Sequence, residues 1–180
     1  MLVSTLSIAF SFLIIGIFLV SGLSKLRKQN YSYYKNTIEN YDIVPSAWAG
    51  PMVKFIACIE IFIALLTFVP SIQKVGLVLA AGMLLIYGYS FIKQLEQGRV
   101  GIACGCSGPA SDLTISAALV VRNSVLVLLC LVACLTPWGA SQTNWSIVIP
   151  GAMVLGLIYI SIEQLLSNNQ KIQALRLSKL

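Results

Sequence analysis

Four or five runs of apolar residues, each close to the length of a membrane-spanning helix, dominate this 180-residue chain. An α-helix needs roughly 20 such residues to cross the hydrocarbon core of a bilayer. Hydrophobic residues make up 58% of the sequence, whereas soluble domains contain about 45–50%. The sequence therefore predicts an all-α, polytopic transmembrane bundle of four to five helices and excludes an ordinary soluble domain.

Prolines, glycines and charged residues separate the expected spans. These spans cover about residues 3–23, 51–69, 74–95, 114–135 and 145–163. Pro51 is expected to open the second span and Pro70 to follow it, because helices tolerate proline at their ends. The tyrosine-rich segment between the first two spans is typical of a short helix in the lipid headgroup layer. Residues 1–180 then form a single integral membrane domain, with a basic polar tail over 168–180.

Basic residues are distributed unevenly between the two sides of this arrangement. With five spans, all but one of the 12 Lys and Arg residues fall on the side of the C-terminus, and the exception is Lys74. Basic loops are retained in the cytoplasm, so the distribution predicts an N-terminus outside the cytoplasm and a C-terminus inside it. The net charge of +6 then reflects topology, and nucleic acid is not an expected partner.

A glycine-rich segment, GRVGIACGCSGPASDLT, carries two cysteines one residue apart. Gly105 allows the sharp bend that would bring the sulfurs of Cys104 and Cys106 together. A disulfide in so tight a ring is strained and easily reduced, which suits it to electron exchange. The pair can also be two small residues in a turn, or two ligands of an incomplete metal site.

The surroundings of the pair favour the reactive thiolate form. Ser111 or Thr114 can cap the following helix, and a helix N-terminus stabilises a nearby anion. Arg99 and Arg122 are expected to add positive potential.

Histidine is absent, which removes Cys–His pairs, Ser–His–Asp triads and most catalytic zinc sites. The other cysteines, Cys58, Cys130 and Cys134, are expected inside the bilayer, so no metal is predicted. Cys130 and Cys134 are four residues apart on one helical face, a spacing typical of helix packing.

Two ionisable residues interrupt the apolar runs. Glu60 and Arg122 must face the protein interior and have partners, because a charge in hydrocarbon is costly. We expect them to pair at similar depth, with Asn123 and Cys58 completing a polar pocket between the second and fourth spans. Lys25 is expected mainly to anchor the interface, with a secondary place in this pocket. The pocket is either an interhelical clamp or a site for a proton or a quinone, and no other cofactor is predicted.

Several motifs together resemble the MauE family of methylamine-utilisation membrane proteins, which is related to the DoxX-like proteins. They are GRVGIACGCSG followed by TISAALVVRN, an acid in the second span, and GLSKL after the first. The family hallmark, a CGC loop before a helix with an Arg-Asn pair, corresponds to Cys104, Gly105, Cys106, Gly108, Arg122 and Asn123, and Glu60 matches the acid. Ala103 and Ser107 depart from the pattern, where an acid and an aromatic residue are usual.

The resemblance implies a DoxX-like, multi-pass protein of the bacterial cytoplasmic membrane that works beside a thioredoxin-like partner. Its implied task is maturation and disulfide formation of a disulfide-rich, extracytoplasmic client, the small (beta) subunit of methylamine dehydrogenase. Such a client would need the cysteine loop outside, whereas the basic residues place it inside. Whether the chain is itself an enzyme stays open. The alternatives are a transporter of a small solute or proton through Glu60 and Arg122, and a noncatalytic scaffold.

Overall fold

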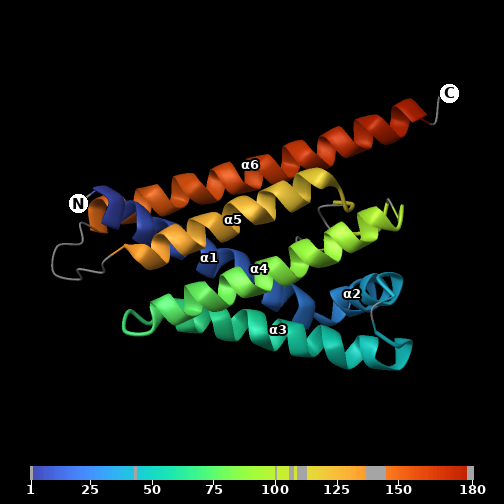
Figure 1. Ribbon diagram of the computed structural model, residues 1–180, viewed down its shortest axis with the longest axis horizontal. Helices are drawn as coiled ribbons and strands as arrows, with labels where there is room; N and C mark the ends of the chain where they lie inside the picture. Colours follow the sequence, from blue (N-terminus) through green and yellow to red (C-terminus); the bar gives the residue numbers. More distant parts are fainter. Residues whose placement is uncertain are drawn as a thin grey trace.

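The computed structural model describes residues 2–42, 44–99, 101–105, 108, 113–136 and 145–177. Over these residues the chain forms six helices and no strand (Figure 1). They are α1 Leu2–Leu26, α2 Lys28–Asn40, α3 Ser46–Phe68, α4 Gln73–Glu96, α5 Ala117–Leu135 and α6 Trp145–Leu177. In this described part, all except α2 are long and apolar enough to cross a membrane. The predicted all-α, multi-pass bundle is confirmed.

The long helices lie side by side, with α1 contacting each of the other five (Figure 1). Apolar side chains of α1, α3, α4 and α5, including Ile14, Ile63 and Leu77, form the main core. In contrast, α6 leaves most of its surface exposed. The two chain ends lie at opposite ends of the bundle, as an odd number of crossings requires (Figure 1).

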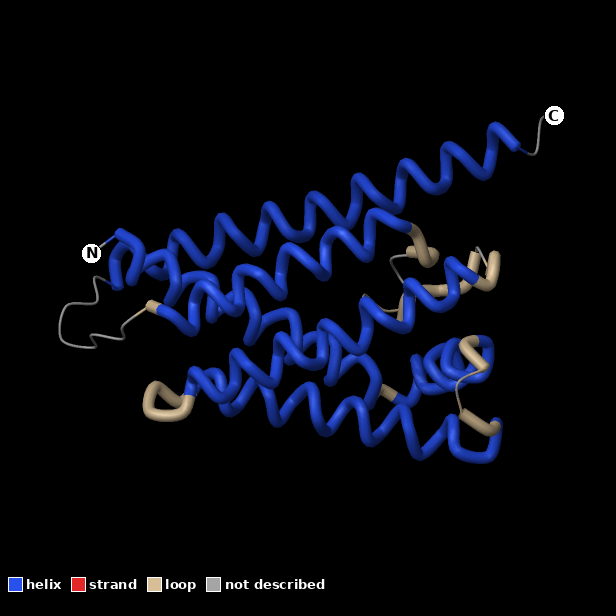
Figure 2. The backbone as a smooth tube through the Cα atoms, in the orientation of Figure 1, coloured by secondary structure: helices blue, strands red, loops and turns tan. Residues whose placement is uncertain are grey.

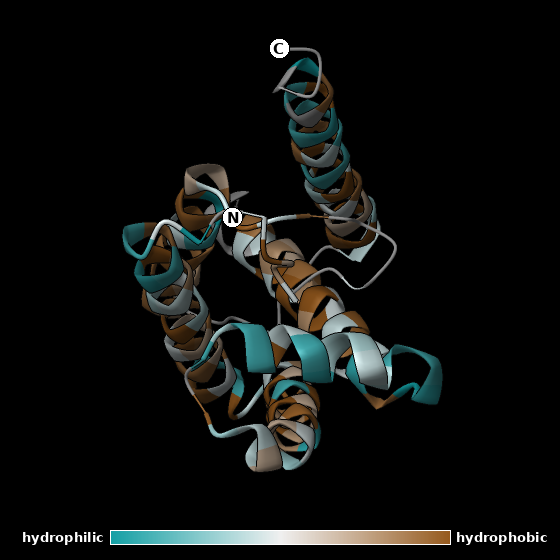
Figure 3. Cartoon of the chain, turned by 90° about the vertical axis from the view of Figure 1, so that its right-hand side faces the viewer, coloured by the Kyte–Doolittle hydropathy of each residue, from teal (hydrophilic) through white to brown (hydrophobic). Residues whose placement is uncertain are grey.

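The short helix expected between the first two spans is α2, which lies across one end of the bundle. Only Tyr34 and Thr37 of this helix are buried. Viewed from that end, α2 shows a mostly hydrophilic surface in front of the long helices (Figure 3). The amphipathic helix therefore covers the bundle end at which α1 finishes and α3 begins.

Two of the expected helix boundaries are wrong at their N-terminal ends. Helix α3 begins at Ser46, so Pro51 lies inside the helix instead of opening it. Pro51 has no backbone N–H, so it donates no helical hydrogen bond to the carbonyl of Ala47. Ala47 is exposed and lies near the start of the helix. Helix α5 begins after its N-cap Ser116, whose side chain makes no capping bond. Thr114 does not cap this helix, because its backbone is paired with Ala103 in an antiparallel bridge.

The last helix is longer than expected. Helix α6 continues to Leu177, so the described part of the expected polar tail is helical. The side-chain amide of Gln170 donates to the carbonyl of Thr114 at 2.9 Å and accepts from its backbone N–H at 3.0 Å. These bonds hold the polar extension of α6 against the residues before α5. Ser111, the other predicted cap, lies outside the described residues.

Gly76 allows α4 to pass close to the end of α3, which gives a test of this packing. A Cβ atom at Gly76 would lie 2.6 Å from the backbone nitrogen of the buried Thr67, whereas one at Gly82 would meet nothing within 4 Å. We predict that Gly76→Ala lowers the free energy of unfolding by about 1–3 kcal/mol through overpacking. The matched control Gly82→Ala should leave stability unchanged or raise it by up to ~1 kcal/mol, because alanine favours helix. Denaturant unfolding in detergent micelles measures both, and equal effects would contradict this packing.

Candidate functional site

The cysteine loop is closed at its base by backbone hydrogen bonds between residues 102–104 and 113–115. The N–H of Cys104 donates to the carbonyl of Leu113 at 2.8 Å, and that of Ile115 donates to the carbonyl of Ile102 at 2.9 Å. The closed base lies at the bundle end that carries α2, where Gly105 approaches that helix (Figure 2). Cys106 lies outside the described residues.

Glycine at position 105 is required both by the backbone and by the neighbouring helix. Gly105 has a φ of +70°, in the left-handed region that favours glycine. A Cβ atom there would lie 3.2 Å from Cγ2 of Thr37 in α2. The left-handed conformation of Gly105 permits a sharp bend after Cys104. That this bend brings the sulfurs of Cys104 and Cys106 together stays a prediction, because Cys106 is not among the described residues. Gly108 also has a positive φ, of +83°.

Cys104 lies beneath α2 and not at the surface. Its residue is 3% exposed. The hydroxyl of Tyr41 donates to the carbonyl oxygens of Cys104 at 2.8 Å and Ala103 at 3.1 Å. The side chain of Gln94 in α4 donates to the carbonyl of Tyr41 at 2.8 Å. Helix α4 therefore holds Tyr41 in place, and Tyr41 in turn holds the cysteine loop. A protein partner cannot reach Cys104 while these contacts hold.

A buried ion pair joins α1 to α3. Nζ of Lys25 lies 2.9 Å from both carboxylate oxygens of Glu60, and both side chains are almost fully buried. Lys25 also donates to Oγ of Ser21 at 2.6 Å, and Ser21 donates to Glu60 at 3.0 Å. Tyr87 of α4 adds a short hydrogen bond to the same carboxylate. The cluster contains one positive and one negative charge, which balance, and it joins the membrane-spanning helices α1, α3 and α4.

The predicted ion pair between Glu60 and Arg122 is wrong. Arg122 instead bonds Glu163 of α6 at 2.7 Å, and Tyr159 donates to the same carboxylate at 2.9 Å. Glu60 pairs with Lys25 because α1 packs directly against α3. Lys25 and Glu163 each lie at the end of an apolar run in the sequence. This position was the signal that could have identified them as the partners of Glu60 and Arg122.

Glu60, Arg122 and Asn123 nevertheless line one small cavity of about 30 Å³, together with Tyr87 and Tyr159. Nδ2 of Asn123 is buried and has no hydrogen-bond partner among the described residues. A space of this size, with these polar groups in a partly apolar wall, has room for a water molecule. The expected polar pocket therefore exists, but the two ion pairs stand on either side of it.

Cys58 does not join this pocket, contrary to the prediction. It is exposed, whereas Glu60 is buried. Residues two apart on a helix point about 200° apart, so they occupy nearly opposite faces. Cys130 and Cys134 of α5 take part in core packing, as predicted, and Cys130 is fully buried.

The two arginines expected to raise the potential around the cysteines bond elsewhere. Nη2 of Arg99 lies 3.4 Å from the carboxylate of Asp42, on the surface. Arg122 bonds Glu163 of α6. Their positive charges are thus directed at carboxylates.

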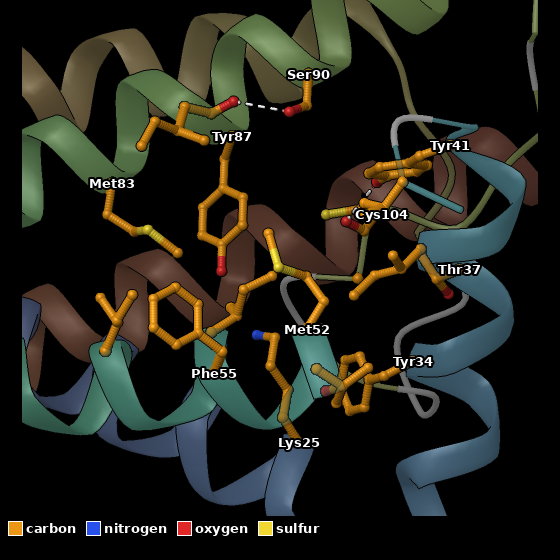
Figure 4. Close-up of a pocket in the computed structure, with 17 residues that line it drawn as sticks. Lys25, Tyr34, Thr37, Tyr41, Met52, Phe55, Met83, Tyr87, Ser90 and Cys104 are labelled. Atoms are coloured by element: carbon orange, nitrogen blue, oxygen red, sulfur yellow. Dashed lines mark hydrogen bonds between the residues drawn. The ribbon is translucent and has the colours of Figure 1, made fainter. Parts of the chain in front are cut away.

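A larger cavity, of about 250 Å³, connects the cysteine loop to the buried ion pair. It lies between α2, α3, α4 and the loop, and Cys104 and Lys25 both line it. The sulfur of Cys104 points into this space from the loop, and the hydroxyl of Tyr87 and the ammonium of Lys25 enter from other sides (Figure 4). Lys25, given a secondary role from sequence, and Tyr87, which the sequence reading missed, are therefore central to the site.

Comparison with known proteins identifies relatives over most of the chain. The family described as "Methylamine utilisation protein MauE" matches residues 3–136. The methylamine utilization protein MauE of Methylophilus methylotrophus is 25% identical over 147 residues, which are 79% of this chain and 76% of the relative. The protein of that name from Paracoccus denitrificans is 28% identical over 115 residues, 64% of this chain and 61% of the relative. No solved structure matches.

The buried ion pair can be tested by stability. Glu60→Ala would leave the Lys25 ammonium buried without its partner, so we predict a loss of about 3–5 kcal/mol in the free energy of unfolding. The double variant Lys25→Met, Glu60→Met should recover most of that loss, because neither charge remains. Glu39→Ala is the control: its pair with Lys35 is partly exposed and should contribute only about 0.3–0.5 kcal/mol. Equal losses for the two single variants in detergent unfolding would show that the Lys25–Glu60 pair has no special role.

Proposed function

Because this chain belongs to the MauE family, we propose that it is the membrane component of a thiol–disulfide system in methylamine utilisation. A buried cysteine of its CGC motif faces a cavity shared with a buried ion pair. The relatives named above are methylamine utilization proteins. The observation that carries the proposal is Cys104, held beneath α2 by the closed loop with its sulfur in the cavity.

The proposed reaction is disulfide exchange with a thioredoxin-like partner. A thiolate of the reduced partner attacks one sulfur of the Cys104–Cys106 disulfide, forms a mixed disulfide and releases the other sulfur as a thiolate. The second partner thiolate then attacks the mixed disulfide. The partner leaves oxidised, and the chain keeps two electrons as a dithiol. Since Cys104 is buried, we assign Cys106 to the mixed disulfide.

The proposed client is extracytoplasmic. By family membership it is the disulfide-rich small (beta) subunit of methylamine dehydrogenase, oxidised through the partner. This part of the proposal places the end of the bundle with α2 and the loop outside the cytoplasm. The basic residues argue for the opposite side, since Arg27, Lys28, Lys35 and Lys93 belong to that end and Lys74 to the other.

A transport path through Glu60 and Arg122 has less support. Each group has an opposite charge within 2.9 Å, and the space between them holds about 30 Å³. A noncatalytic scaffold would need neither sulfur, so the cysteine variants test it directly.

We predict that the two cysteines behave differently when replaced one at a time. Mixed with the oxidised partner, Cys104→Ser should accumulate a mixed disulfide, because the Cys106 thiolate can open the partner's disulfide but no Cys104 thiolate remains to release the partner. Cys106→Ser should form none. Cys58→Ser, which changes an exposed cysteine outside the cavity, is the matched control and should retain normal exchange. Nonreducing gels with mass spectrometry of the adduct measure this.

A full complement of correctly paired client in cells without both Cys104 and Cys106 would refute the redox role and favour the scaffold. Mass spectrometry of the loop peptide provides an independent check. The oxidised form should be lighter than the reduced form by two hydrogens, and no such difference would also refute the redox role.

The side of the loop can be determined by labelling intact cells with a membrane-impermeant maleimide after mild reduction. An extracytoplasmic client predicts that Cys106 is labelled from outside in a variant with the other four cysteines replaced. Labelling only after the membrane is permeabilised would overturn the extracytoplasmic client and leave exchange with cytoplasmic thiols. A single cysteine introduced at Ser71, in the α3–α4 turn at the opposite end of the bundle, should show the reverse pattern.

A further inference from the structure

We infer that the 250 Å³ cavity between α2, α3 and α4 binds the ring of a membrane quinone, which oxidises the Cys104–Cys106 dithiol. This inference rests on the proposed function, because it supplies the acceptor for the electrons that disulfide exchange leaves on the chain. It assigns to the cavity a lipid-soluble ligand of one chemical class.

The position of the cavity gives access from the lipid. Phe55 of α3 and Ile86 of α4 line it, yet their residues are 59% and 61% exposed. Both belong to helices long and apolar enough to span the membrane, so the surface they expose faces hydrocarbon. A quinone can then place its ring in the cavity through this opening and leave its isoprenoid tail among the lipids. The volume lies just below the roughly 300–1,000 Å³ of small-molecule sites, which suits a ring with its tail outside.

The walls suit a flat, neutral ring. Aromatic side chains of Tyr34, Tyr41 and Phe55 and the flexible thioethers of Met52 and Met83 line the space (Figure 4). Such groups pack well against aromatic rings. The ammonium at the wall, Lys25, is matched by Glu60 at 2.9 Å. An anionic lipid headgroup would therefore have to compete with that carboxylate, whereas a neutral carbonyl acceptor would not.

The electron and proton balance closes with these components. The Cys104 and Cys106 thiols lose one proton each and two electrons in total as the S–S bond forms. The quinone gains the two electrons and two protons and leaves as a quinol. Tyr87 and Lys25 carry O–H and N–H groups at the cavity wall and are hydrogen-bonded to Glu60. They are placed to hand protons to the carbonyl oxygens and to be reprotonated through that cluster.

Other cavities of the described residues fit this role less well. The space between Glu60 and Arg122 holds about 30 Å³, too little for a quinone ring. The groove between α1 and α6 is larger, about 340 Å³, but no cysteine lines it. Cys104 therefore selects the cavity beneath α2.

The test uses the full chain in phosphatidylcholine nanodiscs, reduced with dithiothreitol, freed of reductant and mixed with decylubiquinone. We expect one quinol for each two thiols lost, and no quinol from Cys104→Ser. Ile86→Trp should fill the mouth of the cavity and raise the KM for the quinone about tenfold, which corresponds to about 1.4 kcal/mol of lost binding. Leu85→Trp is the matched control: Leu85 is 59% exposed on the same helix and does not line the cavity. It should leave KM unchanged.

The outcomes separate the two proposals. Thiols that exchange with dithiothreitol but never reduce the quinone would overturn the quinone site and leave the proposed function standing. Loop cysteines that exchange with no dithiol would refute the proposed function itself. Equal KM values for Ile86→Trp and Leu85→Trp, with both proteins folded by circular dichroism, would show that the quinone reacts elsewhere. A phospholipid retained in native mass spectrometry and not displaced by the quinone would assign the cavity to lipid instead.

Discussion

The buried contact between Lys25 and Glu60 is the interaction on which the arrangement of this bundle depends. Each charge taken alone into a membrane interior costs several kcal/mol, and the cost is offset only when the two groups meet with good geometry. That condition allows one register of α1 against α3. Ser21 and Tyr87 satisfy further hydrogen bonds of the same carboxylate, so α4 is drawn into the same register. The same contacts hold Lys25 and Tyr87 in the wall of the large cavity.

The cysteine loop is attached to this rigid part through α2. Tyr41 holds the carbonyl of Cys104, and Gln94 of α4 holds Tyr41. Gly105, in its left-handed conformation, lies so close to α2 that a Cβ atom there would be 3.2 Å from Cγ2 of Thr37. One face of the buried cysteine consequently meets the same space as the ion pair. A second pair, between Arg122 and Glu163, performs the equivalent joining of α5 to α6.

Much of the fold could be predicted because a bilayer imposes a length and a polarity on every span. The five apolar helices follow from that constraint, and Gly105 follows from the need for a bend between two cysteines. The ion-pair partners did not follow in the same way. Glu60 had to be paired, but depth along the membrane allowed Arg122 as readily as Lys25, and depth says nothing about which helices are neighbours. Cys58 was misplaced for a related reason. It is two residues from Glu60 in sequence, and this spacing puts the two side chains on nearly opposite faces of the helix.

By itself the sequence determined that the chain is a helical membrane protein, that Glu60 and Arg122 need buried partners, and that a CGC motif belongs to the segment between two of the apolar helices. Those properties depend on local composition and spacing, which the chain carries in one dimension. Only the tertiary structure decided which charges meet and that Cys104 shares a lipid-facing cavity with Lys25 and Tyr87. These contacts join residues far apart in the chain, and they depend on the order in which five similar helices pack, to which apolar periodicity is almost indifferent.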